Sequence, residues 1–356
     1  MPRDIPVGNG SMLVTFDLEY QIRDIYYPYV GKENHTIGHP CRMGVWVDGQ
    51  FSWMGGDWQK TLKYKEDSLV TDVKARNNRL KIELQMYDTV DFHLNIFVKE
   101  IVVRNLEGRD REIRLFFNHD FHIYENEIGD TAYYDPDTRA IIHYKSQRYF
   151  LINCCDPTKC GVDHFATGIK ELRGAEGTWR DAEDGTLSGN PIAQGSVDST
   201  LGINLQIMAH GKNTAHYWIA AGMKHSDVVT LNKVIWEKTP EELIRRTENY
   251  WKMWVNKEAF NFYDLPQKLV SFFKRSLLII RTQIDNNGAI IAANDSDIVQ
   301  MGRDTYSYMW PRDGALVAYA MIKSGYMEVT KRFFQFCADV ISKDGYLLHK
   351  YNPDRS

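Results

Sequence analysis

Apolar and polar residues alternate along the first two thirds of the chain, which is the pattern of β-strands with one buried face. Residues 79–86, RLKIELQM, place their four apolar side chains on one face and charged or amide side chains on the other. Residues 91–105 and 112–124 continue the pattern. Clusters of Gly, Asp and Asn that favour turns separate the runs, at residues 7–11, 47–50, 76–79 and 135–138. We therefore expect strands to about residue 235, arranged as a large antiparallel β-sandwich.

The hydrophobic period then changes to that of α-helices. Residues 239–254, TPEELIRRTENYWKMW, begin with Thr239 as N-cap, Pro240 in the first turn and Glu242 three positions after the cap, which is a capping box. Three more helices are predicted, at residues 265–284, 311–324 and 326–345. Helices that follow helices predict an all-α region after the β domain.

The helix predicted at residues 265–284 is apolar on nearly every side, so it needs neighbours all around it. Four helices offer few such neighbours. We therefore expect a fragment of a longer chain, or a domain that is completed elsewhere. The predicted division is a β-sandwich domain at 1–238, a helical linker at 239–262 and the start of a larger helical domain at 263–356.

Composition and charge exclude several classes of protein. Aromatic residues reach 13%, with 20 Tyr, 16 Phe and 9 Trp, which fits either large cores or stacking surfaces for flat ligands. The net charge of −4, without long runs of one sign, argues against a nucleic-acid or membrane-surface partner. No stretch has the length and hydrophobicity of a spanning helix, and the first residues lack an apolar signal core. We expect a cytoplasmic protein, and the sequence leaves its oligomeric state open.

Neither the cysteines nor the histidines predict a metal site. The five cysteines are an odd, sparse set that fits a reducing compartment, and Cys154, Cys155 and Cys160 match no zinc spacing. In the NHDFH motif, a strand would place Asp120 and His122 on one face and His119 on the other. Two ligands on one face are too few for zinc. We therefore expect no metal and no cofactor.

The motif that carries chemistry is YSYMWPRDGAL, residues 306–316. It places aromatics and an Arg-Asp pair at the predicted start of a helix, which suits a polar ligand with flat apolar faces, such as a sugar. The alternative is a purely structural role for the Arg-Asp pair, as a helix cap beside a solvated charge. Arg303 and Asp304 form a second such pair, for which we favour a structural role as a turn. Trp251 and Trp254, at helical spacing, are interpreted as core or docking residues.

These residues resemble the family 15 glycoside hydrolases, the glucoamylases and their relatives. YSYMWPRDGALVAYAMIKSGY is similar to the family's first substrate-binding motif, and the segments GNGSMLVTFDLEYQIRDIYYPYVGKENH and MGVWVDGQFSWM resemble the β domain of its bacterial and archaeal branch. The resemblance covers residues 5–354. It implies a β-sandwich, a helical linker and an (α/α)6 barrel, of which this chain would hold the first helices.

The resemblance also implies inverting exo-hydrolysis of α-glucosidic bonds in malto-oligosaccharides or starch-type glucans. It assigns Tyr308, Trp310, Arg312 and Asp313 to substrate binding, around the terminal glucose. Inversion needs a general acid and a general base on opposite sides of the bond. In the family both are glutamates far C-terminal to this motif, so we expect them beyond Ser356 and expect this chain alone to be inactive.

Two alternatives stay open on the sequence. A trehalase-type α-glucoside hydrolase would use the same motif, because the residues that select between the two substrates lie outside this chain. A non-catalytic carbohydrate-binding fragment is the alternative from a different class.

Overall fold

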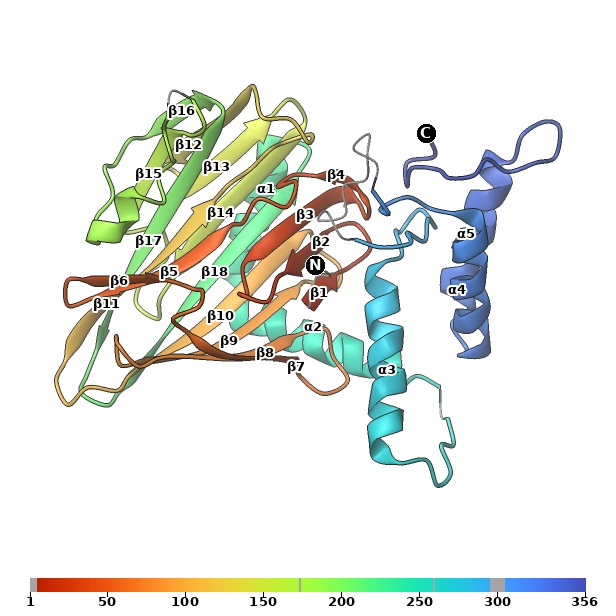
Figure 1. Ribbon diagram of the computed structural model, residues 1–356, viewed down its shortest axis with the longest axis horizontal. Helices are drawn as coiled ribbons and strands as arrows, with labels where there is room; N and C mark the ends of the chain where they lie inside the picture. The colour runs from red at the N-terminus through yellow and green to blue at the C-terminus, as the bar shows by residue number, and fades with distance from the viewer. Residues whose placement is uncertain (1–4, 173, 259, 295–304) are drawn as a thin grey trace.

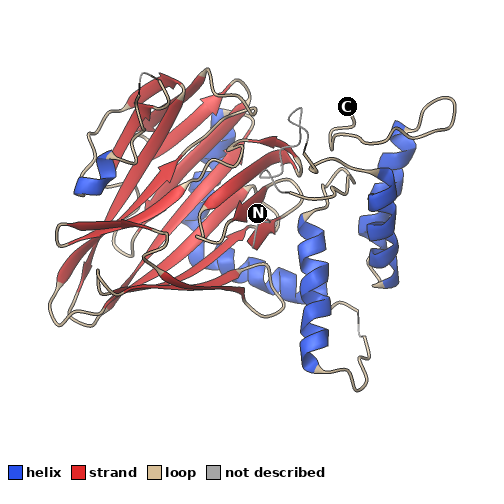
Figure 2. Ribbon diagram, in the orientation of Figure 1, coloured by secondary structure: helices blue, strands red, loops and turns tan. Residues whose placement is uncertain are grey.

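A computed structural model describes residues 5–172, 174–258, 260–294 and 305–356. These residues form a β-rich part followed by helices, as Figure 1 and Figure 2 show. Eighteen strands, five α-helices and one short 3-10 helix at Asp181–Asp184 lie within them. The strands pair antiparallel throughout three sheets. The predicted order of a large antiparallel β domain before an α region is therefore confirmed.

The three sheets have four, nine and five strands. The four-stranded sheet consists, in order, of β1 (Ile5–Gly8), β2 (Leu13–Phe16), β3 (Ile22–Tyr29) and β4 (Lys32–Asn34). The nine-stranded sheet has the order β16 (Ile192–Gly195), β12 (Asp130–Asp135), β13 (Ala140–Lys145), β14 (Arg148–Cys155), β18 (Lys212–Gly222), β10 (Ile96–Asn105), β9 (Ile82–Val90), β8 (Thr71–Asn77) and β7 (Gln59–Tyr64). The five-stranded sheet has the order β15 (His164–Ile169), β17 (Val197–Ile207), β11 (Arg111–His119), β5 (Arg42–Val47) and β6 (Gln50–Trp53).

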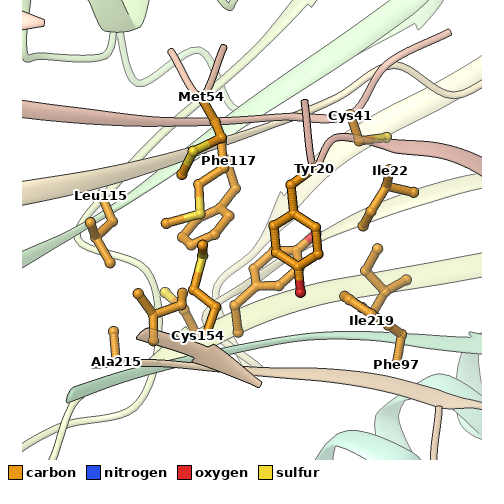
Figure 3. Close-up of a cluster of buried hydrophobic side chains, with 14 of the residues drawn as sticks. Tyr20, Ile22, Cys41, Met54, Phe97, Leu115, Phe117, Cys154, Ala215 and Ile219 are labelled. Atoms are coloured by element: carbon orange, nitrogen blue, oxygen red, sulfur yellow. The ribbon is translucent and has the colours of Figure 1, made fainter. Parts of the chain in front are cut away.

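One hydrophobic core joins the sheets. Leu115 of β11, Phe97 of β10 and Tyr20 of the β2–β3 loop are all buried in it, and Figure 3 shows their side chains converging. Strand β10 explains how the sheet has two buried faces. Phe97 belongs to the sandwich core, whereas Ile96 and Val98 belong to a second cluster, because successive side chains point to opposite faces.

The second cluster is covered by two helices, α1 (His225–Lys238) and α2 (Pro240–Val255). Helix α1 corrects the expectation of strands to about residue 235. Val228 and Ile235 face the sheet at helical spacing, and Asn232 accepts a hydrogen bond of 2.9 Å from Nε1 of the buried Trp218. Its start is rich in β-branched residues, which favour strands by propensity, and packing onto the sheet overrides that preference.

Helix α2 begins as predicted at Pro240, with Thr239 Oγ1 accepting a hydrogen bond of 3.4 Å from the Glu242 amide. The Glu242 carboxylate pairs with Arg245. Trp251 is buried with Leu69 and Leu278, and the Trp254 ring lies 4.2 Å from the Tyr326 ring, which confirms that both tryptophans are packing residues.

The remaining helices are α3 (Gln267–Thr282), α4 (Pro311–Lys323) and α5 (Met327–Val340). Helices α4 and α5 lie side by side, and both stand apart from the sandwich in Figure 1. Helix α5 is shorter than the predicted helix at 326–345, because Ile341 is extended and a turn closed by a hydrogen bond from the Ser342 amide to the Tyr346 carbonyl follows it. None of the helices in the described residues is long and apolar enough to cross a membrane.

The helical part leaves much apolar surface uncovered. Its own core includes Leu277, Met309 and Phe333, but Phe272 of α3 is 71% exposed and Leu316 of α4 is 66% exposed. A groove of about 540 Å³ runs beside Leu269 and Phe272. The neighbouring helices thus do not cover all of the apolar surface of α3, as its nearly all-apolar pattern predicted. The domain boundaries at 238 and 262 stay a prediction, and the packing of α2 on the sheet groups this helix with the sandwich.

Candidate functional site

The segment before helix α4 is held on both sides by backbone hydrogen bonds. Met309 and Tyr351 exchange two bonds of 2.9 Å, which fixes the segment against the C-terminal residues. On the other side, the Ala292 amide donates to the Tyr308 carbonyl at 3.1 Å. Because Met309 is fully buried in the helical core, its neighbours Tyr308 and Trp310 are directed away from that core.

The β domain also contacts the segment before α4, through β3 and the β3–β4 turn. Ser307 Oγ lies 3.1 Å from the hydroxyl of Tyr26 on β3, and Ile291 packs with Tyr26 and Val30. The β3–β4 turn approaches so closely that a Cβ on Gly31 would lie 2.6 Å from the Ser307 carbonyl oxygen and 2.6 Å from Ile291 Cγ2. Gly31 also has a φ of +93°, which only glycine adopts readily. The β domain and the helical part therefore contact each other directly next to the candidate site.

The buried carboxylate of Asp285 stabilises this contact. Asp285, which follows α3, accepts hydrogen bonds of 2.9 Å from the Val30 amide and 2.7 Å from the Asn287 amide. Burial raises the pKa of Asp285 to about 6, and the two amide donors work in the opposite direction. Asp285 is only 1% exposed, so we assign it a positioning role in the domain contact.

Helix α4 starts at the predicted place. Trp310 is its N-cap with extended φ and ψ, Pro311 occupies the first turn, and the Gly314 amide donates to the Trp310 carbonyl at 2.8 Å. Within the described residues no side chain caps this end, so the cap part of the alternative interpretation is wrong, whereas the 85% exposure of the Arg312 side chain agrees with its solvated-charge part. Asp313 lies in the first turn, where the helix dipole favours a negative charge.

Arg312 and Asp313 are paired loosely and lie open to solvent. The distance from Arg312 Nη2 to Asp313 Oδ2 is 3.4 Å, and the side chains are 85% and 40% exposed. An exposed pair with this geometry contributes little to stability. Both groups therefore keep hydrogen-bonding capacity that a ligand can use.

The two aromatic side chains of the segment pack against residues 349 and 350. The Trp310 ring lies 4.6 Å from the His349 ring at an angle of 81°, and Lys350 Nζ lies 4.1 Å above the Tyr308 ring. The indole Nε1 of Trp310 is shielded from solvent and has no acceptor among the described residues.

Tyr308, Trp310, Arg312 and Asp313 thus lie in one short segment, and the fold packs His349 against Trp310 and Lys350 against Tyr308. No periodic pattern in the sequence predicts His349 and Lys350, because these two residues reach the rings only through the fold of the chain around α4 and α5. The second Arg-Asp pair, Arg303 and Asp304, lies outside the described residues.

No family model matches the chain. A curated relative, an uncharacterized glycosyl hydrolase of Methanocaldococcus jannaschii, is 26% identical over 355 residues, which cover 97% of this chain and 54% of the relative. Among solved structures, a bacterial glucoamylase complexed with acarbose superimposes with a TM-score of 0.78 at 15% identity, over 99% of this chain and 52% of that one. The chain has the same fold as this part of the glucoamylase. It spans about half the length of both proteins.

Proposed function

We propose that this chain is the β-sandwich and sugar-binding part of a glycoside hydrolase. Three observations support the proposal together: the relative described as a glycosyl hydrolase, the fold shared with a glucoamylase, and the residues of the segment from Tyr308 to Asp313. The last of these carries it, because it joins two aromatic side chains, an exposed guanidinium and a partly exposed carboxylate in one short segment.

These groups match the chemistry of a sugar ring. A pyranose has hydroxyl groups around its rim and C–H groups on its faces, so it needs both hydrogen-bonding partners and an apolar wall. Arg312 and Asp313 supply charge-assisted hydrogen bonds, which are stronger than neutral ones. Trp310 and Tyr308 supply the apolar wall.

The finer proposal is a glucoamylase-like α-glucosidase that inverts the anomeric carbon. Such a reaction needs two carboxyl groups about 6.5–9.5 Å apart, with a water molecule between one of them and the sugar. We assign no proton transfer to the four site residues, and we propose that the general acid and base come from outside residues 1–356. Malto-oligosaccharides and starch-type glucans are the substrates proposed for the complete enzyme.

Binding tests the site without requiring turnover. Titration calorimetry of the 356-residue protein with acarbose should show binding, and Arg312→Ala should weaken it about 10- to 100-fold, since a hydrogen bond to a charged group contributes about 1.5–3 kcal/mol. Lys331→Ala, which removes an exposed cation on α5, is the matched control and should bind as the wild type does. Equal weakening by both variants, or no binding by the wild type, would contradict the proposed site.

Hydrolysis tests the assignment of the catalytic groups. The purified chain should release no glucose from maltose, maltotriose or trehalose, because it lacks the proposed proton-transfer pair. Turnover that persists through purification and is lost in Asp313→Asn would show that Asp313 performs the chemistry that we place elsewhere.

A further inference from the structure

Three side chains with metal-ligating atoms converge on the β domain, far from Trp310 in the sequence. They are His39, in the turn after β4, and Asp120 and His122, which follow β11. Their ligand atoms all lie within 4.8 Å of one another. His122 Nε2 is 3.2 Å from Asp120 Oδ1, His39 Nδ1 is 3.9 Å from Asp120 Oδ2, and the two imidazole rings stack at 4.1 Å.

The backbone holds the two loops in this arrangement. The His122 amide donates to the His35 carbonyl at 2.7 Å, which ties the turn that carries His39 to the end of β11. His119, by contrast, belongs to a separate buried network with Tyr217 and Ser199, at 2.8 Å and 3.2 Å. The strand alternation therefore excluded His119 correctly, and the third ligand comes instead from a distant turn.

A lysine ammonium already occupies the centre of this cluster. Lys170, which follows β15 and is 3% exposed, donates to a carboxylate oxygen of Asp120, to His122 Nε2 at 2.8 Å and to the Phe121 carbonyl at 3.1 Å. Because an ammonium group has donors and no acceptor, Nε2 of His122 must present its lone pair to Lys170. The other ring nitrogen, Nδ1, is buried without a hydrogen-bond partner among the described residues.

An imidazole lone pair and a carboxylate directed at one cation are also what a metal ion of the zinc type requires. The second imidazole, His39, is 40% exposed on its side chain, so the cluster opens to solvent on that side. Two histidines and one carboxylate would leave a fourth position for water. Nitrogen ligands favour zinc and similar cations over magnesium or calcium, which prefer oxygen ligands.

We propose that His39, Asp120 and His122 form a binding site for a zinc-type divalent cation and that the ammonium group of Lys170 competes with the metal for it. With Lys170 in place, the carboxylate of Asp120 has a cationic partner, and a divalent ion would lie beside a like charge. Metal binding therefore requires that the side chain of Lys170 withdraws from Asp120 and His122. The wild-type protein should bind the metal weakly, and removal of the ammonium group should make the site strong.

Zinc titration calorimetry on the complete 356-residue protein tests this competition. Lys170→Gln should bind one Zn²⁺ at least about 10-fold more tightly than the wild type, and His39→Ala in the Lys170→Gln background should abolish the gain. His210→Ala in the same background removes an exposed histidine elsewhere and should leave the affinity unchanged. The Co²⁺ form of Lys170→Gln should show the visible bands of a four-coordinate site, which a purely structural ion pair would not produce.

A stability measurement covers the case in which Lys170→Gln folds poorly. A ligand that binds only the native state raises the melting temperature, so Zn²⁺ should raise that of Lys170→Gln much more than that of the wild type. Equal zinc affinities for the wild type and Lys170→Gln, or an affinity that His39→Ala does not change, would overturn the proposal. The cluster would then be a buried ion pair alone.

Discussion

Gly31 in the β3–β4 turn offers a direct test of the contact between the β domain and the candidate sugar site. We predict that Gly31→Ala destabilises the protein and weakens acarbose binding, because the new methyl group collides with the carbonyl of Ser307 and the side chain of Ile291. Gly49, in the β5–β6 turn, is the matched control. It also has a positive φ, +76°, but a Cβ there meets nothing within 4 Å.

Both substitutions place a side chain at a positive φ, but only one of them also causes a steric clash. Placing alanine at a positive φ costs about 1–2 kcal/mol, and this applies to both Gly31 and Gly49. Only Gly31→Ala adds a clash, with separations of 2.6 Å to two atoms where ordinary contacts are longer. Overpacking of this kind costs about 1–3 kcal/mol more. We therefore expect a loss of about 1–2 kcal/mol for Gly49→Ala and about 2–5 kcal/mol for Gly31→Ala.

Urea unfolding followed by tryptophan fluorescence measures the free energies of unfolding, and calorimetry with acarbose measures the site. Gly31→Ala should lower both quantities, whereas Gly49→Ala should lower the stability slightly and leave the binding unchanged. Equal losses of stability in the two variants, with acarbose binding intact in both, would refute the close contact between the β3–β4 turn and the segment before α4.

Two further predictions concern the β domain and its linker helix. Arg246→Ala should lower the free energy of unfolding in urea by about 3 kcal/mol, because Arg246 Nη2 lies 2.7 Å from the fully buried Asp91 carboxylate and its removal leaves that charge without its partner. Arg245→Ala removes only an exposed pair with Glu242 and should cost less than about 1 kcal/mol. Similar losses for both variants would disprove the anchoring role of Arg246. Burial lowers the pKa of His35 to about 3, whereas a histidine in the unfolded chain takes up a proton near pH 6.5. The contribution of the neutral His35 to the free energy of unfolding is therefore fully present above pH 6.5 and is lost as the pH falls towards 3. The stability difference between the wild type and His35→Gln should therefore shrink by about 2 kcal/mol between pH 8 and pH 5, and a difference that does not change with pH would contradict the buried neutral imidazole.

Local sequence patterns were sufficient to predict the helices of the C-terminal part and the start of the candidate site. Pro311 follows an extended residue and precedes an apolar period, so α4 could be placed without knowledge of its neighbours. The strand alternation likewise identified the β domain. Helix α1 could not be predicted in this way, because its β-branched residues favour strands until the apolar face of β14 and β18 is present.

Contacts between distant segments account for the rest. The central strand β18 pairs with β14 and β10, and β5 pairs with β11, and none of these neighbours follows from the order along the chain. The same limit applies to the sites. His39 joins Asp120 and His122 from a turn after β4, and His349 joins Trp310 around two helices, so neither partner carries a local signal.

The central claim is that a sugar binds at Trp310, Arg312 and Asp313, and the indole N–H of Trp310 reports on it most directly. The protein has nine tryptophans, and two-dimensional ¹H–¹⁵N NMR resolves their indole signals in a separate region, where Trp310→Phe identifies the signal of interest. Because the Trp310 ring is proposed to line the bound sugar, its indole signal should shift on addition of acarbose. In Arg312→Ala the same shift should require much more acarbose. A Trp310 signal that stays in place at acarbose concentrations that shift another indole would contradict the proposed site.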